Sequence, residues 1–189
     1  MSLTDFDIRE ALLQKLKTEN SGGNYKIIEE FVICDGKARA DVATVNGIMK
    51  GFEIKSDVDS LTRLANQIER YDATFDKCTI VVGGKFKNKI DDFVPEHWGI
   101  LCAYRNRVGK VTLKNVRSAT FNKNVSERAL LDLVWSDEIK MFLKQNEIRG
   151  YSNKNKFQLV ELINCNFSLP TIKHFTRETL KNRQGWRAV

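Results

Sequence analysis

The chain has 189 residues, of which 42% are hydrophobic and 29% charged, enough for one sizeable core and a small addition but not for two ordinary domains. Two prolines and eleven glycines exclude collagen-like and low-complexity sequence, and no apolar run approaches the roughly 18 residues of a membrane span. The net charge is +7, and acidic residues stand where a signal peptide would be basic and then apolar. We therefore expect a cytoplasmic protein without membrane contact.

The N-terminal residues predict a helix followed by a strand. Thr4 or Asp5 can cap a helix whose apolar residues fall on one arc at about 100° per residue, namely Phe6, Ile8, Leu12, Leu13 and Leu16. Ser21–Asn24 ends this helix. Tyr25–Ile33 is apolar and β-branched and precedes a turn at Asp35-Gly36, so we expect a strand there.

A β-hairpin is the next predicted element, because Ala38–Val45 and Ile48–Lys55 flank the turn pair Asn46-Gly47. Its two strands are therefore expected to pair antiparallel. Apolar residues at helical spacing between Ser60 and Phe75 then predict a helix.

Two further strands complete the predicted N-terminal domain. Cys78–Val82 is a short continuous apolar run, typical of a buried strand. A short helix over Lys87–Phe93 and a strand over Trp98–Ala103 follow. The resulting α-β-β-β-α-β-α-β order predicts that residues 1–103 form one α/β domain.

The remaining residues are basic. Residues 1–103 carry 14 Lys and Arg against 17 Asp and Glu, a net charge of −3, whereas residues 104–189 carry 17 against 7, a net charge of +10. Residues 104–134 predict a connecting β-ribbon and a helix, and residues 135–189 predict a basic helical region. This asymmetry indicates a polyanionic partner, of which DNA is the one we expect, with a solvated basic surface as the alternative.

The register of the hairpin decides whether its acidic residues meet. A three-residue loop over residues 46–48 pairs Val42 with Phe52 on an apolar face, whereas a two-residue loop would mix the faces along the whole ladder. The three-residue loop places Asp41 directly opposite Glu53. Two adjacent carboxylates destabilise a sheet by a few tenths to about 1 kcal/mol unless a cation lies between them.

Asp41 and Glu53 suit a divalent cation. Mg²⁺ binds one or two carboxylates together with carbonyl, water and phosphate oxygens, and the carbonyl of Ile54 is available beside Glu53; Mn²⁺ can take the same place. Lys55 shares a strand face with Glu53 and can act as a positive charge on water or phosphate. The alternative is an ordinary polar sheet face on which Lys55 and Arg39 neutralise the carboxylates.

The segment ARADVATVNGIMKGFEIKSDVDSL resembles the metal-binding core of the PD-(D/E)XK nuclease superfamily, in which Asp and (Asp/Glu)-x-Lys lie on adjacent strands of an α-β-β-β-α-β core. More narrowly, the chain is similar from about Asp7 to Ala103 to an uncharacterised bacterial family of small predicted endonucleases. The resemblance implies a restriction-endonuclease-like fold with a mixed sheet. It also implies that Asp41 and Glu53 bind the metal and that Lys55 acts on the attacking water.

The predicted helix after this segment carries a second match. Gln67 and Tyr71 resemble the Gln-x₃-Tyr signature of the RecB-like branch, and Arg63 lies one turn earlier. The resemblance implies that Gln67 takes part in catalysis and that Arg63 and Tyr71 contact nucleic acid, although packing alone also explains Tyr71. Glu10 resembles an accessory carboxylate of the superfamily, with a solvated helix face as the alternative.

The segment Trp135–Ile163 pairs two short amphipathic stretches around Gly150-Tyr151-Ser152. It resembles a helix–extended loop–helix DNA-binding element of the SAP type, and a plain helical hairpin explains the pattern equally well. In the SAP-type interpretation the phosphate contacts are basic residues of this segment, namely Lys144, Arg149, Lys154 and Lys156.

Together these features predict a Mg²⁺-dependent DNA endonuclease. The alternative is a catalytically inactive nuclease-fold module that binds DNA or a protein partner.

The four cysteines (Cys34, Cys78, Cys102 and Cys165) form no CxxC pair, which argues against a zinc finger and predicts buried free thiols. No GxxxxGK[ST] loop is present, so we expect no nucleotide cofactor.

Overall fold

The computed structural model of the chain describes residues 2–185, and its first helix begins at the predicted cap. Thr4 and Asp7 form a capping box, in which the Asp7 amide donates to the Thr4 hydroxyl at 3.3 Å and the Thr4 amide donates to the Asp7 carboxylate at 3.0 Å. Helix α1 (Asp5–Glu19) buries three residues of the predicted apolar arc, Ile8, Leu12 and Leu16. The predicted first helix is therefore confirmed.

Six strands form one mixed sheet whose spatial order is the chain order. They are β1 (Lys26–Ile33), β2 (Ala38–Val45), β3 (Met49–Lys55), β4 (Lys77–Val82), β5 (Gly99–Arg105) and β6 (Val111–Arg117). The pairs β3–β4 and β4–β5 are parallel, and the other three pairs are antiparallel. Helix α2 (Leu64–Thr74) makes the crossover between β3 and β4. The predicted mixed α/β architecture is confirmed.

The β2–β3 hairpin has the predicted register. Val42 pairs with Phe52 and Val45 with Met49, so residues 46–48 form a three-residue loop. The ladder ends at Val42 and Phe52, one pair before the predicted Asp41–Glu53 pair. Beyond this pair the two strands no longer form backbone ladder pairs and interact through side chains instead. The end of the ladder therefore leaves space for a functional site.

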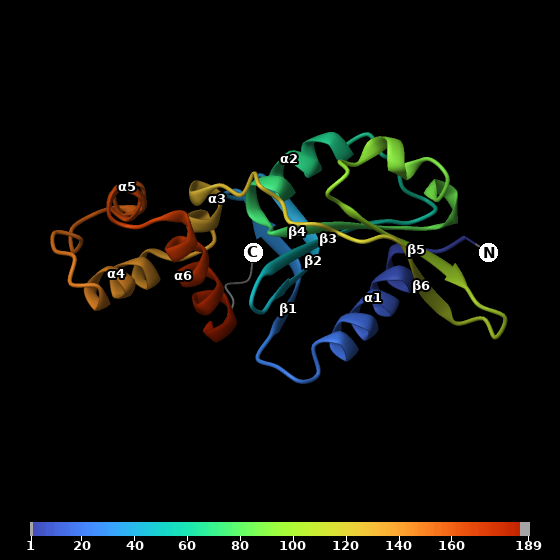
Figure 1. The fold of residues 1–189 in the computed structure, drawn as a ribbon, viewed down its shortest axis with the longest axis horizontal. Coiled ribbons are helices and arrows are strands. Elements are labelled where there is room, and N and C mark those ends of the chain that lie inside the picture. Colours follow the sequence, from blue (N-terminus) through green and yellow to red (C-terminus); the bar gives the residue numbers. More distant parts are fainter. Residues whose placement is uncertain (1, 186–189) are drawn as a thin grey trace.

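Helices cover both faces of the sheet (Figure 1). Helix α1 packs on one face against a cluster that includes Val42, Phe52, Ile54, Val81 and Leu101. Helix α2 packs on the other face in a larger cluster that includes Ala43, Met49, Tyr71, Phe75 and Ile80 and that continues into the C-terminal helices. The sheet face that carries Glu53 and Lys55 is therefore buried, and the alternative of an ordinary polar face does not describe it.

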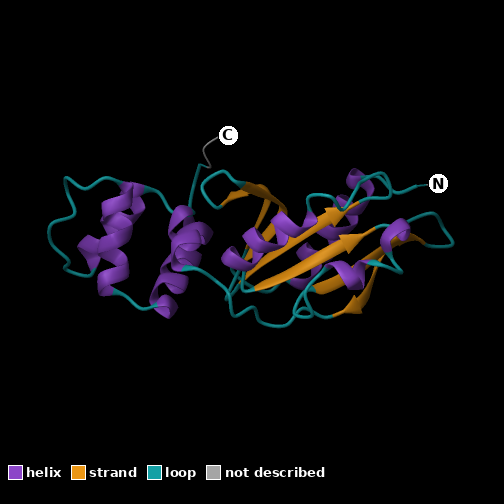
Figure 2. Cartoon of the chain, turned by 90° about the horizontal axis from the view of Figure 1, so that it is seen from above, coloured by secondary structure: helices purple, strands orange, loops and turns teal. Residues whose placement is uncertain are grey.

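The C-terminal residues form four helices, α3 (Glu127–Asp132), α4 (Ser136–Gln145), α5 (Lys156–Asn166) and α6 (Leu169–Asn182). Helices α4 and α5, with residues 146–155 between them, have the predicted helix–loop–helix order. Figure 2 shows α4–α6 as a lobe beside the sheet. One hydrophobic cluster nevertheless includes both Ile80 of the sheet and residues of this lobe, among them Ile139, Leu159 and Leu180. The lobe is therefore not an independent appendage.

Residues 104–117 belong to the sheet. Strand β5 passes through Ala103, where we expected a domain boundary, and pairs with β6 across a turn at Gly109. The predicted β-ribbon is thus the edge of the sheet. None of the helices within residues 2–185 is long and apolar enough to cross a membrane.

Two short features differ from the sequence prediction. Between β4 and β5 the chain forms two 3₁₀ helices, η1 (Gly84–Phe86) and η2 (Ile90–Phe93), where we expected one helix over Lys87–Phe93. A segment this short does not offset the unfavourable nucleation of an α-helix. Three of the four cysteines are buried as expected, but Cys165 on α5 is exposed.

Candidate active site

A cleft of about 550 Å³ lies beside the carboxyl end of β3. Residues of α1, of the β1–β2 hairpin, of β3 and of α2 with its preceding loop form its walls. The predicted site residues among them are Asp41, Glu53, Ile54, Lys55, Arg63 and Gln67. The fold therefore brings together site residues that were predicted on two strands and on one helix with the residue before it.

Glu53 lies at the centre of a buried hydrogen-bond network. Its Oε1 accepts from Lys55 Nζ at 2.7 Å and from Gln67 Nε2 at 2.5 Å, and its Oε2 accepts from the Tyr71 hydroxyl at 2.7 Å. Gln67 Oε1 in turn accepts from Lys55 Nζ at 2.9 Å. The side chains of Glu53 and Lys55 are only 2% and 7% exposed, so little water screens their attraction. The network holds both charged groups in one geometry.

Asp41 occupies the position where the β2–β3 ladder ends. Its Oδ2 accepts from the Ile54 amide at 2.7 Å, and its Oδ1 lies 3.5 Å from Arg9 Nη2. Burial and, next, the nearby negative charge of Glu53 raise the pKa of Asp41 to about 7, while the Ile54 hydrogen bond and Arg9 oppose this shift. Two carboxylates that disfavour each other's charge in this way are poised to share a cation.

The donor set of the cleft fits Mg²⁺. Asp41 and Glu53 supply two carboxylates, and the Ile54 amide faces Asp41, which places the Ile54 carbonyl on the same edge of β3. Residues 2–185 contain no group of three or more His, Cys, Asp or Glu side chains that could enclose a metal. Two carboxylates, one carbonyl and open positions for water and phosphate match the preference of Mg²⁺ rather than that of an enclosed structural metal.

Arg9 on α1 reaches Asp41 in the candidate active site. This contact was not predicted from the sequence. Its guanidinium donates to the Asp41 carbonyl at 2.8 Å and contacts the carboxylates of Asp5 and Glu30, each at 2.9 Å. Glu10, the predicted accessory carboxylate, is exposed and does not line the cleft. Consecutive helical residues point about 100° apart, so Glu10 turns toward solvent when Arg9 faces the sheet.

Tyr71 is completely buried, which corrects the prediction that it contacts nucleic acid. Its ring lies 5.3 Å from that of Phe75 and 5.4 Å from that of Trp98, measured between centroids. Burial and then the charge of Glu53 raise the pKa of Tyr71 well above its ordinary value, so the hydroxyl remains protonated and donates to Glu53. Tyr71 thus serves both the core and the site.

Four basic residues form the rim of this cleft, namely Lys37, Arg39, Arg63 and Arg70. Two come from the β1–β2 hairpin and two from α2 and the residue before it. We call this set the cleft rim. Of its members only Arg63 was predicted to contact nucleic acid. Helical spacing could have identified Arg70, because it follows Gln67 by three residues and therefore shares its helix face.

The predicted phosphate contacts of the C-terminal lobe do not reach the cleft. Lys144 and Arg149 are exposed and Lys154 is half-buried, all near the link between α4 and α5. Lys156 is engaged inside the molecule, because its Nζ donates to the Val134 carbonyl just beyond α3, and burial lowers its pKa. This bond engages one donor of the half-buried Lys156 ammonium, and its contact with phosphate stays a prediction.

Other positive charges of the lobe are also used internally. Lys173 on α6 contacts Asp76 at 2.8 Å, and Arg177 donates to the Gly47 carbonyl in the β2–β3 loop. The net charge of +10 in residues 104–189 therefore overstates the charge that is open to a polyanion. The cleft rim adds positive charge to the domain whose net charge is −3, with Arg39 of the rim paired to Glu30 at 2.7 Å.

Comparisons with known proteins relate the chain to a phage family. A family model described as Bacteriophage P4 protein cII matches residues 2–187. The chain is also similar to Protein cII of Enterobacteria phage P4, with 29% identity over 181 residues that cover 96% of this chain and 68% of that protein. No solved structure matches this chain. Because the family model matches nearly every residue, the chain belongs to the bacteriophage P4 protein cII family.

Proposed function

We propose that this protein is a Mg²⁺-dependent endonuclease that hydrolyses phosphodiester bonds in DNA in the cytoplasm. The observation that carries the proposal is the meeting of Asp41, Glu53 and Lys55 in one cleft, with Gln67 bonded to both Glu53 and Lys55. The element order from α1 to β4 agrees with a restriction-endonuclease-like core. This agreement supports membership of the PD-(D/E)XK superfamily.

Each side chain of the cleft has its own role in the proposed reaction. Asp41, Glu53 and the Ile54 carbonyl would hold Mg²⁺, or Mn²⁺ in its place, which acts as a Lewis acid on the phosphate and stabilises the leaving oxygen. Lys55 is placed to orient the attacking water and to offset negative charge on the phosphate. Gln67 fixes the Lys55 ammonium by its own hydrogen bond.

The buried charges of the cleft favour an active enzyme over an inactive binding module. A buried Lys–Glu pair adds little net stability, because the loss of hydration offsets most of the attraction. A module that only binds DNA or a protein would use the cleft rim but would have no use for the Lys55–Glu53 pair beneath it. A catalytic role explains both the basic cleft rim and the buried Lys55–Glu53 pair.

Nicking of a supercoiled plasmid tests the proposal. With Mg²⁺ or Mn²⁺ the purified protein should convert supercoiled plasmid into open circles, and EDTA should stop the conversion. Single-stranded DNA and RNA tested in parallel define the preferred nucleic acid. A protein that retards the plasmid in a gel but nicks it with neither ion would be the inactive module.

The cleft rim should contribute more to DNA binding than the lobe does. The double variant Arg63→Gln/Arg70→Gln should flatten the slope of log K against log salt by about 1.8, because each lost phosphate contact on duplex DNA accounts for about 0.9. Lys144→Gln/Arg149→Gln removes the same charge from the lobe and should change the slope less. Fluorescence anisotropy titrations in EDTA at several salt concentrations measure both slopes. A larger change in the lobe variant would contradict this assignment.

A further inference from the structure

A second, smaller cleft lies on the sheet face that α1 covers. Its volume is about 250 Å³, and its lining includes Lys50, Phe52, Lys77, Thr79 and Leu101. In the parallel β3–β4 ladder Lys50 pairs directly with Lys77, so the two side chains leave adjacent strands on the same sheet face. We call it the Lys50–Lys77 cleft.

Positive charge exceeds negative charge in this cleft, because its lining holds one carboxylate, Glu19, and the basic residues Lys15, Lys50, Lys77 and Arg117. Like charges directly opposite each other in a sheet are destabilising, and within residues 2–185 neither Lys50 nor Lys77 forms an ion pair. The two nearby carboxylates are engaged elsewhere, since Glu19 contacts Lys15 at 2.7 Å and Asp76 contacts Lys173 at 2.8 Å. The arrangement therefore retains an unfavourable charge pair that an anion between the lysines would relieve.

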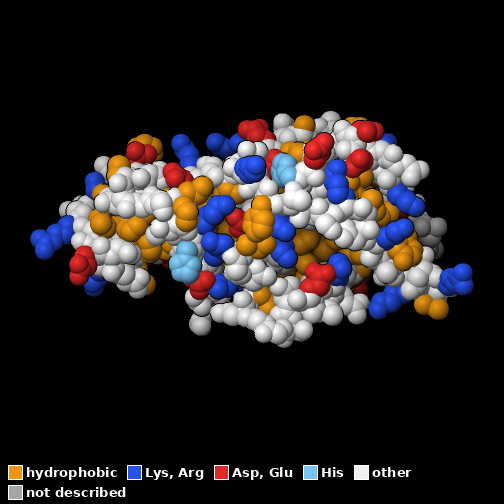
Figure 3. Space-filling model, viewed as in Figure 1, with side chains coloured by type: hydrophobic (Ala, Val, Ile, Leu, Met, Phe, Trp, Pro, Cys, Tyr) orange, Lys and Arg blue, Asp and Glu red, His pale blue; other side chains and the backbone are white. Residues whose placement is uncertain are grey.

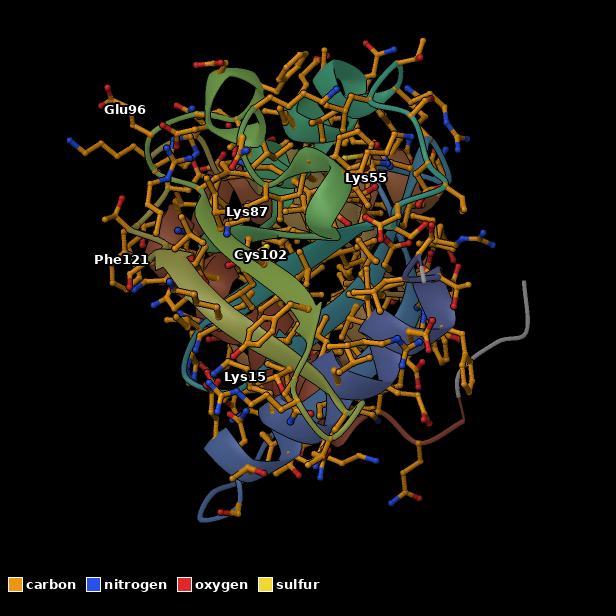
Figure 4. All side chains as sticks on the ribbon, turned by 90° about the vertical axis from the view of Figure 1, so that its right-hand side faces the viewer. Lys15, Lys55, Lys87, Glu96, Cys102 and Phe121 are labelled. Atoms are coloured by element: carbon orange, nitrogen blue, oxygen red, sulfur yellow. The ribbon has the colours of Figure 1, made fainter. Side chains whose placement is uncertain are left out.

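An exposed aromatic ring adjoins the lysines. The Phe121 side chain is 61% exposed, and Lys77 Nζ lies 4.7 Å from the centre of its ring. Phe52 and Leu101 add apolar surface to the same cleft. Figure 3 shows basic side chains gathered around hydrophobic ones near the centre of one face, and Figure 4 places Phe121 at the left edge and Lys15 in the lower part of the view, both away from Lys55.

We propose that the Lys50–Lys77 cleft binds a segment of single-stranded nucleic acid, with a phosphate between Lys50 and Lys77 and a base on Phe121. A basic groove with an exposed aromatic side chain is the usual platform for a single strand, because any unpaired base can stack on the ring. A base in a duplex cannot reach the ring in this way. The small cleft offers room for a phosphate group, and Phe121 lies outside it, beside Lys77, where a base could stack.

This site is separate from the candidate active site. Lys50 and Lys55 lie at opposite ends of β3, and five residues of strand span about 16 Å. The inference therefore does not rest on the proposed nuclease activity. Binding measured in EDTA, where no Mg²⁺-dependent cleavage takes place, tests it independently of that activity.

The test is a fluorescence anisotropy titration of the full-length protein with labelled oligothymidylate of about 12 nucleotides, within the range of known single-strand sites. Lys50→Gln/Lys77→Gln should bind at least about tenfold more weakly and flatten the salt slope by about 0.7, because the two lysines share one phosphate and each phosphate contact on a single strand accounts for about 0.7. The control Lys87→Gln/Lys89→Gln removes the same charge from the exposed segment between η1 and η2. It should bind like the wild type.

The aromatic contact has its own test. Phe121→Ala should weaken binding about tenfold, and Phe121→Trp should retain it, because stacking on the ring needs only an aromatic face. Thermal unfolding checks that each variant is folded, and the lysine variant should be at least as stable as the wild type because it relieves like-charge repulsion.

Two outcomes would overturn the inference. One is that the Lys50→Gln/Lys77→Gln variant binds the oligonucleotide as tightly as the Lys87→Gln/Lys89→Gln control. The other is that thymidine monophosphate or inorganic phosphate displaces the oligonucleotide at equal phosphate concentration. Displacement of this kind would identify a site for a free nucleotide or anion and not for a strand.

Discussion

Loss of Mg²⁺-dependent nicking is the expected result of replacing Asp41 by Asn or Glu53 by Gln. Either change removes one of the two carboxylates that line the cleft. Metal-assisted stabilisation of the transition state amounts to several kcal/mol, and each 1.36 kcal/mol corresponds to about tenfold in rate. We therefore expect the initial nicking rate to fall by about three orders of magnitude in each variant.

Glu10→Gln is the matched control for these two variants. It also removes one carboxylate, but Glu10 lies exposed outside the cleft, so the nicking rate should remain that of the wild type. Unchanged nicking by purified, folded Asp41→Asn or Glu53→Gln would refute the metal site. A loss of nicking in Glu10→Gln would restore the accessory role that the resemblance implied.

The two active-site variants should differ in stability even though both lose activity. Glu53→Gln leaves the Lys55 ammonium buried without a carboxylate, and breaking a buried ion pair in this way lowers the free energy of unfolding by about 3–5 kcal/mol. Asp41→Asn leaves the Lys55–Glu53 pair in place and lets the amide oxygen accept the Ile54 hydrogen bond. Asp41→Asn is therefore the cleaner catalytic variant.

The second large effect is a pH dependence of stability without metal. The pKa of Asp41 is about 7 in the folded protein against an ordinary value of 3.8. Between these values the folded state holds a proton that the unfolded state has released, so the free energy of unfolding falls as the pH rises. The Asp41→Asn variant lacks this fall, because an asparagine side chain does not titrate.

In EDTA, Asp41→Asn should exceed the wild type in unfolding free energy by about 1–2 kcal/mol at about pH 8 and should lose this advantage by about pH 4. The value lies below the full effect of the pKa shift because the Asp41 side chain is 23% exposed, so that water screens part of its charge. Urea unfolding followed by circular dichroism at both pH values measures the difference. A variant no more stable than the wild type at the higher pH would show that Asp41 ionises freely in the metal-free protein.

The sequence by itself determined the order of the elements and the pairing of β2 with β3. The alternation of side chains along a strand has a period of two, so a shift by one residue would have moved every apolar side chain to the wrong face. Together with the turn at Asn46-Gly47 this left one register, and that register brings Asp41, just beyond the end of the ladder, into the same cleft as Glu53. Helical spacing placed Gln67 and Tyr71 on one face of α2 for the same local reason.

Only the tertiary structure decided which remote elements meet at each surface. Arg9 reaches Asp41 because α1 packs on the sheet face opposite α2, mainly over β3 and β6, and Tyr71 is buried because α2 lies flat on the sheet. Lys50 adjoins Lys77 because a helical crossover sets the register of the parallel β3–β4 pair. Periodicity states which face of an element a residue occupies, but the packing of distant elements determines what lies opposite that face.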